Sequence, residues 1–73
     1  MSFGSRLRKA RRAKYTQDEL ANKLNVSRQL ISKWETDKSE PSIRFLAELA
    51  VALDVSRDYL IDGVFEDADD TTT

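Results

Sequence analysis

The sequence predicts a single all-α domain of five helices, and three observations lead to this prediction. Apolar residues recur at spacings of three and four along the chain, and no segment shows the alternation typical of a strand. Pro occurs once and Gly twice in 73 residues, which indicates that short connections join the helices. Ser or Thr precedes four of the apolar-periodic segments, at the position expected for a helix N-cap.

The first helix is expected over residues 4–13, and all of its charged positions are basic. The second begins at "TQDEL", because Thr16 and Glu19 form a capping box in which each side chain satisfies a free backbone N–H. Its inner face consists of Leu20, Ala21 and Leu24. Asn25 follows, and Asn tolerates the left-handed conformation that is common where a helix ends.

A third helix is expected from its cap at Ser27 to about Thr36. Ile31 and Trp34 lie three apart on its inner face, which predicts that the indole belongs to the core. The opposite face carries four hydrogen-bonding side chains, two of them cationic, and no acid: Arg28, Gln29, Ser32 and Lys33.

Two further helices follow the loop "TDKSEP". Ser42 caps the fourth, whose apolar stripe consists of Ile43, Leu46, Leu49, Ala50 and Leu53. Ser56 caps the fifth. Residues 1–63 are therefore expected to form the domain, and residues 64–73, which are acidic and uncapped, are predicted to be a disordered tail.

The composition excludes several classes of function. The chain has no Cys and no His, so thiolate metal sites, disulfides and the commonest general base are absent. It also lacks a Gly-rich phosphate loop, and we therefore predict no enzymatic activity, no metal and no cofactor. No apolar run approaches the ~20 residues of a membrane span and no signal-peptide pattern is present, so a cytoplasmic protein is expected.

The net charge of −1 conceals two halves of opposite charge. Residues 1–38 contain ten Lys and Arg against four Asp and Glu, a net charge of +6. Residues 39–73 contain two against nine, a net charge of −7. A basic half of this kind favours a polyanionic partner. Long-range attraction is expected from Arg6, Arg8, Lys9, Arg12 and Lys14.

The second and third predicted helices, joined by "NVS", have the dimensions of a helix-turn-helix. Ala21 is small where the two helices must cross closely, and Asn25 supplies the sharp turn. Val26 and Ile31 are placed to fill the angle between the helices. The spacing together with the basic surface therefore predicts a DNA-binding motif.

The sequence resembles the Cro-type, lambda-repressor-like helix-turn-helix domains of phage and bacterial repressors. The resemblance covers about Leu7 to Gly63, and "TQ-x-ELA", "VS-x-x-x-IS-x-WE" and "LA-x-AL-x-V" occur in the family's order. It implies a compact five-helix domain that binds operator DNA as a symmetric dimer. The chain departs from the family at "AKYT", where the link is one residue shorter, and at Asn25, where Gly is frequent.

The outward face of the third helix is predicted to read bases in the major groove. Arg28 can fork onto guanine O6 and N7, and Gln29 can pair with adenine N6 and N7. Lys33 lies one turn further along, and Ser32 is short and adaptable. The resemblance implies the same positions, because members of the family read bases from the first two turns of this helix.

Phosphate contacts are expected around this helix. Gln17 lies at the N-terminus of the second helix, where free N–H groups and the helix dipole attract anions. The resemblance implies that Gln17 and Thr16 grip the DNA backbone. The remaining candidates are Ser27, which also caps, and Lys38 and Arg44, which flank the loop after the third helix. The resemblance also implies an ion pair between Glu35 and Arg11.

A homodimer is expected, because one helix reads too few base pairs to find one site in a genome. The recognition helices must lie on one side of the dimer, so we place the interface in the acidic half. Its apolar candidates are Val55, Ile61, Val64 and Phe65, with the loop of residues 37–41 as the alternative.

Two other functions remain open at this point. The chain is also compatible with the antitoxin of a toxin–antitoxin pair, whose acidic C-terminal half would bind a protein partner. The other alternative is a protein-interaction module that has lost DNA binding, against which the basic first half argues.

Overall fold

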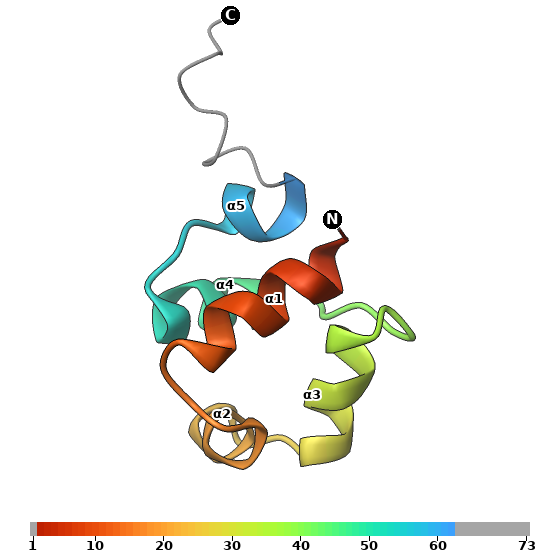
Figure 1. The fold of residues 1–73 in the computed structure, drawn as a ribbon, viewed down its shortest axis with the longest axis vertical. Coiled ribbons are helices and arrows are strands. Elements are labelled where there is room, and N and C mark those ends of the chain that lie inside the picture. Colours follow the sequence, from red (N-terminus) through yellow and green to blue (C-terminus); the bar gives the residue numbers. More distant parts are fainter. Residues whose placement is uncertain (1, 63–73) are drawn as a thin grey trace, which may run out of the picture.

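The computed structural model describes residues 2–62, and within this range all regular structure is helical (Figure 1). The helices are α1 (Phe3–Arg12), α2 (Gln17–Leu24), α3 (Arg28–Glu35), α4 (Ile43–Leu53) and α5 (Arg57–Asp62). This confirms the predicted all-α class with five helices. The predicted tail of residues 64–73 lies outside the described residues.

The predicted N-caps are confirmed for α2 to α5. Thr16 Oγ1 accepts from the Glu19 amide at 3.1 Å, and Glu19 Oε1 accepts from the Thr16 amide at 2.8 Å. The hydroxyls of three Ser residues likewise accept from the amide three residues later, at Ser27, Ser42 and Ser56. For α1 the expected limits of 4–13 are one residue too late at both ends, because Ser2 forms a cap that we did not predict.

Short turns in the left-handed conformation end two of the helices. Asn25 has φ 64° and ψ 41°, as its position after α2 predicts. Asp54 has φ 59° after α4, and Asp37 has φ 61° in the loop after α3. Asn and Asp tolerate this region better than other non-Gly residues, so no Gly is needed at these turns.

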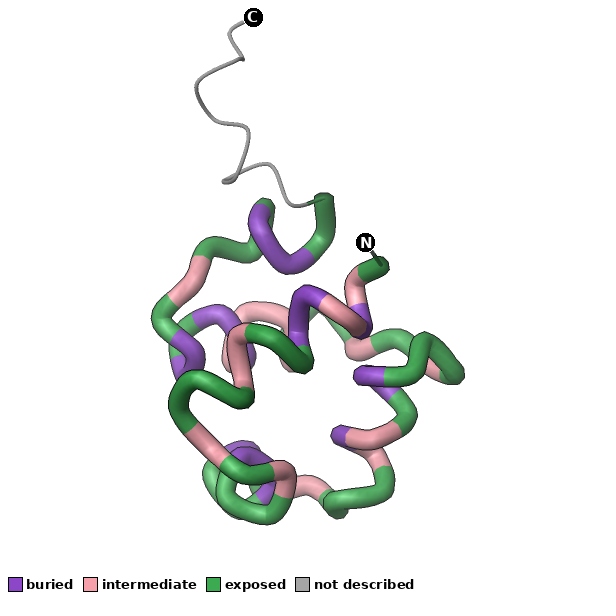
Figure 2. Tube along the Cα trace, viewed as in Figure 1, coloured by how far each residue is buried: buried purple, intermediate pink, exposed green. Residues whose placement is uncertain are grey.

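One core lies between the helices (Figure 2). The largest side chains that are fully buried are Trp34, Leu7, Leu20, Ile31, Leu49 and Leu60. Trp34 is 2% exposed and its ring centroid lies 5.6 Å from that of Phe45, which confirms its predicted place in the core. Ile43 was wrongly assigned to the inner stripe of α4 and is 78% exposed. It is the first residue of α4, and Phe45 and Leu46 pack against the core in its place.

Helix α1 packs against both α3 and α5, while α2 packs against α3 and α4. The contact between α1 and α3 is close at Gly4, where an added Cβ would lie 2.5 Å from the Glu35 carbonyl oxygen and 2.7 Å from that of Trp34. Backbone atoms cannot move aside as a flexible side chain can. Gly4 is therefore required by the distance between the two helices.

Arg6 joins α1 to the end of α5. Its Nε donates to the Leu60 carbonyl oxygen at 3.0 Å, and its Nη2 donates to the Ile61 carbonyl oxygen. These carbonyls belong to the last turn of α5, which lacks intrahelical donors. The expectation that Arg6 adds to the surface charge was wrong, because the residue is 7% exposed and acts as a C-terminal cap.

Candidate nucleic-acid interface

Helices α2 and α3 form a helix-turn-helix whose angle is fixed by the three residues between them. The Val26 amide donates to the Ala21 carbonyl oxygen at 2.9 Å, which closes the turn after α2. Ala21 is 3% exposed and Val26 packs partly buried against the core. Ile31 is fully buried as well, so Val26 and Ile31 lie inside the angle as their spacing predicts. Helix α3 is thus held with its polar face toward solvent.

The four predicted base-reading residues lie on this solvent face of α3. Arg28, Gln29 and Lys33 are exposed, and Ser32 is half-buried. Three of them, Arg28, Gln29 and Ser32, line one depression together with Gln17 of α2. The structure thus brings a predicted phosphate ligand next to predicted base readers.

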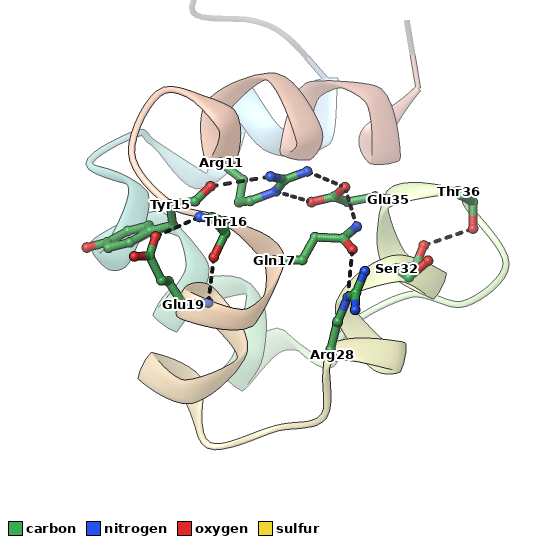
Figure 3. Close-up of polar contacts among 9 residues, drawn as sticks. All are labelled: Arg11, Tyr15, Thr16, Gln17, Glu19, Arg28, Ser32, Glu35 and Thr36. Carbon is green, nitrogen blue, oxygen red and sulfur yellow. Dashed lines mark hydrogen bonds and ion pairs between the residues drawn. The ribbon is translucent and has the colours of Figure 1, made fainter.

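A network of polar contacts links Arg28 on this face to side chains of α2 and α1 (Figure 3). Arg11 Nε donates to Glu35 Oε2 at 2.8 Å and Arg11 Nη2 to Glu35 Oε1 at 3.0 Å, so the pair is bidentate. Gln17 Nε2 also donates to Glu35 Oε1 at 3.1 Å. Arg28 Nε in turn donates to Gln17 Oε1 at 3.4 Å. This network of polar contacts therefore connects α1, α2 and α3.

These contacts confirm the ion pair of Arg11 with Glu35 that the resemblance implies, and they add Gln17 to it. The side chains of Arg11 and Glu35 are 11% and 3% exposed, and their bidentate geometry is the kind that compensates for loss of solvent. Glu35 also fixes the direction of the Gln17 amide, whose oxygen then accepts from Arg28. Arg28 has a second neighbour in Asp18, with 3.9 Å between Nε and Oδ1.

The N-terminus of α2 opens into a cleft of about 510 Å³. Three Arg and two acids contribute to its lining, which consists of Arg8, Arg11, Thr16, Gln17, Asp18, Arg28, Glu35 and Thr36. Arg11 neutralises Glu35, so the charges that remain in the lining are those of Arg8, Arg28 and Asp18. Their sum is positive. The cleft is therefore a suitable place for an anion.

Of the other predicted phosphate ligands, Thr16 lines this cleft, while Ser27, Lys38 and Arg44 lie outside it. The hydroxyls of Thr16 and Ser27 already accept from backbone amides as caps. Lys38 is exposed in the loop between α3 and α4. Arg44 is exposed in the first turn of α4, where its Nε lies 3.3 Å from Glu48 Oε2 and its guanidinium lies over the Phe45 ring.

The predicted dimer residues do not form one patch. Ile61 is 47% exposed and lines a groove of about 350 Å³ with Phe3, Asp37, Glu40, Pro41 and Leu46. Val55 is half-buried against the core and lines a separate cleft beside Tyr59. Val64 and Phe65 lie outside the described residues. Ile61 and the loop of residues 37–41 were alternative interfaces in the sequence analysis, but they line the same groove.

Sequence reasoning missed the role of Asp37. Its Oδ1 accepts from the Gly4 amide at 2.9 Å, so the loop after α3 is bound to the N-terminus of α1. A hydrogen bond from the Ser2 hydroxyl, followed by the one from Gly4, lowers the pKa of the Asp37 carboxyl below its ordinary 3.8. An acid in a polar loop gives no sequence signal for a contact 33 residues away.

The part of the chain that the structure describes contains no helix long and apolar enough to cross a membrane. Nor does this part contain a group of three or more acidic side chains that could hold a metal ion.

Comparisons with known proteins agree with this geometry. A helix-turn-helix family model matches residues 6–60. The chain is 42% identical over 62 residues to the SPbeta prophage-derived uncharacterized HTH-type transcriptional regulator YonR of Bacillus subtilis. The matched region covers 84% of this chain and 57% of that protein. It is 44% identical over 62 residues to the HTH-type transcriptional regulator ImmR of the same species, with 84% and 49% covered. The chain thus spans about half the length of these curated relatives.

The fold also matches a solved structure. The P22 c2 repressor protein, crystallised in complex with a synthetic operator, superimposes with a TM-score of 0.81 at 38% sequence identity. The match covers 86% of this chain and 97% of that one.

Proposed function

The chain belongs to the helix-turn-helix family, and on that premise we propose that it is a transcriptional repressor that occupies an operator in duplex DNA. The observation that carries this proposal is the hydrogen bond between Arg28 at the start of α3 and Gln17 at the start of α2. It joins a residue suited to read a base with a residue suited to hold a phosphate. The relatives are regulators of transcription and the structural neighbour is a repressor bound to its operator, which supports the proposal.

Arg28 is the principal base reader in this proposal. Gln17 accepts from its Nε, so the two terminal amino groups are left to donate to O6 and N7 of a guanine. Gln29 pairs with adenine, while Ser32 and Lys33 contact the bases or phosphates further along the groove. A guanidinium already held at Nε loses less side-chain entropy on binding than a free one.

The phosphate contacts lie on both sides of α3. Gln17 and Thr16 hold one phosphate at the N-terminus of α2, where the helix dipole adds attraction. Ser27, Lys38 and Arg44 hold phosphates around the N-terminus of α3 and the loop beyond it. The ion pair of Glu35 with Arg11 serves this function too, because an unpaired carboxylate beside Gln17 would repel the phosphate.

The operator in this proposal is palindromic and is bound by two copies of the chain. Ile61, with Pro41 and Leu46 in the same groove, forms the centre of the interface, and Val55, Val64 and Phe65 extend it. Asp58 and Asp62 lie on the same helix and repel their counterparts in a second copy. The dimer is therefore weak in solution and becomes firm on DNA, where both copies are held side by side.

Selection of binding sites from a random duplex library tests the DNA-reading proposal. The wild-type chain should select a palindrome, and Arg28→Ala should lose roughly 1–3 kcal/mol of discrimination at one base pair of each half-site. Lys23→Gln is the matched control, because Lys23 is exposed on α2 outside the cleft. This substitution also removes one positive charge. Unchanged base preference in the Arg28 variant would remove this residue from the reading role.

Analytical ultracentrifugation with and without the selected operator tests the interface. Ile61→Asp should bind the operator as single copies without cooperativity. Val51→Asp is the control, since Val51 is 82% exposed on α4 and lies outside the groove. Cooperative binding by the Ile61 variant would place the interface elsewhere.

A further inference from the structure

The five cationic side chains of α1 differ in burial and in their partners. Arg6 is buried and caps α5, and Arg11 is paired with Glu35. Arg8 and Arg12 are both exposed, and neither forms an ion pair within the part of the chain that the structure describes. The basic character of α1 is therefore available for a partner at these two residues and at Lys9.

Arg8 and Arg12 continue the candidate DNA surface onto α1. Arg8 lines the cleft that also contains Gln17 and Arg28. It lines a second, adjoining depression with Arg12, Ser5 and Lys9, to which no acid contributes. Residues four apart in a helix lie on the same face, about 6 Å apart along its axis. We call Arg8 and Arg12 the α1 ridge.

We propose that the α1 ridge is a second DNA-binding surface, which holds phosphates that flank the base pairs read by α3. This inference rests on the proposed function, because it takes the phosphate at Gln17 as its starting point. A strand whose phosphate lies in the cleft passes Arg8 when it leaves the cleft in the direction of α1. The ridge then accommodates about two successive phosphates, whose axial rise is about 3.4 Å each.

The chemistry of the ridge fits phosphate better than it fits a structural role. An Arg guanidinium can donate two parallel hydrogen bonds to a phosphate, so its contact has direction as well as charge. Two like charges at positions i and i+4 repel each other in the free helix. A bound phosphate relieves this repulsion, and no acid of α1 does so, because the helix contains none in its first turn or elsewhere in its sequence FGSRLRKARR.

A salt titration with a random-sequence 30-base-pair duplex tests the ridge without knowledge of the operator. The affinity of the wild type and of the double variant Arg8→Gln/Arg12→Gln is measured from 50 to 200 mM salt. Loss of two phosphate contacts should reduce the slope of log K against log salt by about 1.8. Over this range of salt, that difference in slope corresponds to about a tenfold difference in affinity.

The matched control is Lys23→Gln/Arg57→Gln, which removes the same two charges from exposed positions outside both depressions. The proposal expects its slope to stay close to that of the wild type. Thermal melting of both double variants verifies that they fold, and the exposed positions of the four residues favour this.

The outcomes separate this inference from the function on which it rests. Salt-dependent binding by the wild type with an unchanged slope in the Arg8/Arg12 variant overturns the α1 ridge and leaves the proposed function intact. An equal decrease in both double variants also overturns it, because net charge alone would then explain the effect. If the wild type binds no duplex at any salt concentration, both proposals are overturned.

Discussion

The ion pair between Arg11 and Glu35 provides a quantitative test of how the domain holds α3. Both side chains are largely removed from solvent, with 11% and 3% exposed, and they share two hydrogen bonds. Glu35→Met leaves the buried Arg11 charge with the Tyr15 carbonyl oxygen but without its carboxylate partner, which costs about 3–5 kcal/mol. A chain of 73 residues has a total stability of roughly 4–11 kcal/mol. The single variant therefore loses a large part of its free energy of unfolding.

Arg11→Met should have a similar effect, since it leaves the carboxylate unpaired. The double variant replaces both charges with apolar side chains of similar length, so no buried charge remains. We expect it to be less destabilised than either single variant, with a coupling energy above about 2 kcal/mol. Urea denaturation can be followed by fluorescence, because Trp34 is the one Trp of the chain and is 2% exposed.

Additivity would refute this reasoning. If the losses in the two single variants sum to the loss in the double variant within about 0.5 kcal/mol, the charges are independent. The pair would then have no role in joining α1 to α3.

Three further predictions concern the stability of the domain. Gly4→Ala should destabilise the domain by about 1–3 kcal/mol in urea denaturation, because its Cβ meets the Glu35 carbonyl oxygen; an unchanged midpoint would contradict the close approach. Asp37→Asn should lower the melting temperature at pH 7, and this difference should vanish as the pH falls through the lowered pKa of the Asp37 carboxyl. A carboxyl whose pKa is lowered by folding stabilises the folded state at pH values above its ordinary pKa of 3.8, and this contribution is lost as the pH falls. A difference in melting temperature that persists in acid would contradict this prediction. Trp34→Ala should cost about 3–5 kcal/mol, and a folded variant that has lost only DNA affinity would show that the indole is a surface contact.

The elements that could be predicted from the sequence are those that local physics determines. The caps at Thr16, Ser27 and Ser42 depend on side chains within three residues of the helix they begin. The left-handed turn at Asn25 likewise depends on its own residue type. The helical periodicity of Ile31 and Trp34 predicted their burial correctly, because both lie on the face of α3 that packs against the core.

The errors concern side chains whose environment comes from distant parts of the chain. The Arg6 guanidinium is buried because the last turn of α5, 54 residues away, supplies acceptors. Ile43 matches the apolar stripe of α4, but the N-terminus of that helix extends beyond the core. Periodicity identifies the face of a helix that a residue lies on, and it does not show where the neighbouring helix ends.

The candidate site was predicted as a set of residues and not as a network. The sequence placed Gln17 and Arg28 on the surface of a helix-turn-helix, with one expected to hold a phosphate and the other a base. Their hydrogen bond depends on the crossing of α2 and α3 and on the orientation that Glu35 gives to the Gln17 amide. A single sequence contains no direct signal for such a three-way contact.

The contacts of α1 explain why a helix without proposed base contacts matters for reading DNA. It binds the C-terminal end of α3 through Glu35 and the loop beyond it through Asp37, and it closely approaches the backbone there at Gly4. The N-terminal end of α3, which carries Arg28, lies at the opposite end of the helix from these attachments, and Arg28 contacts Gln17 and Asp18 of α2 there. A rotation of α1 would therefore be transmitted along α3 and would displace the guanidinium of Arg28 at its other end. It follows that substitutions at the attachments of α1 should weaken base discrimination even in variants that remain folded.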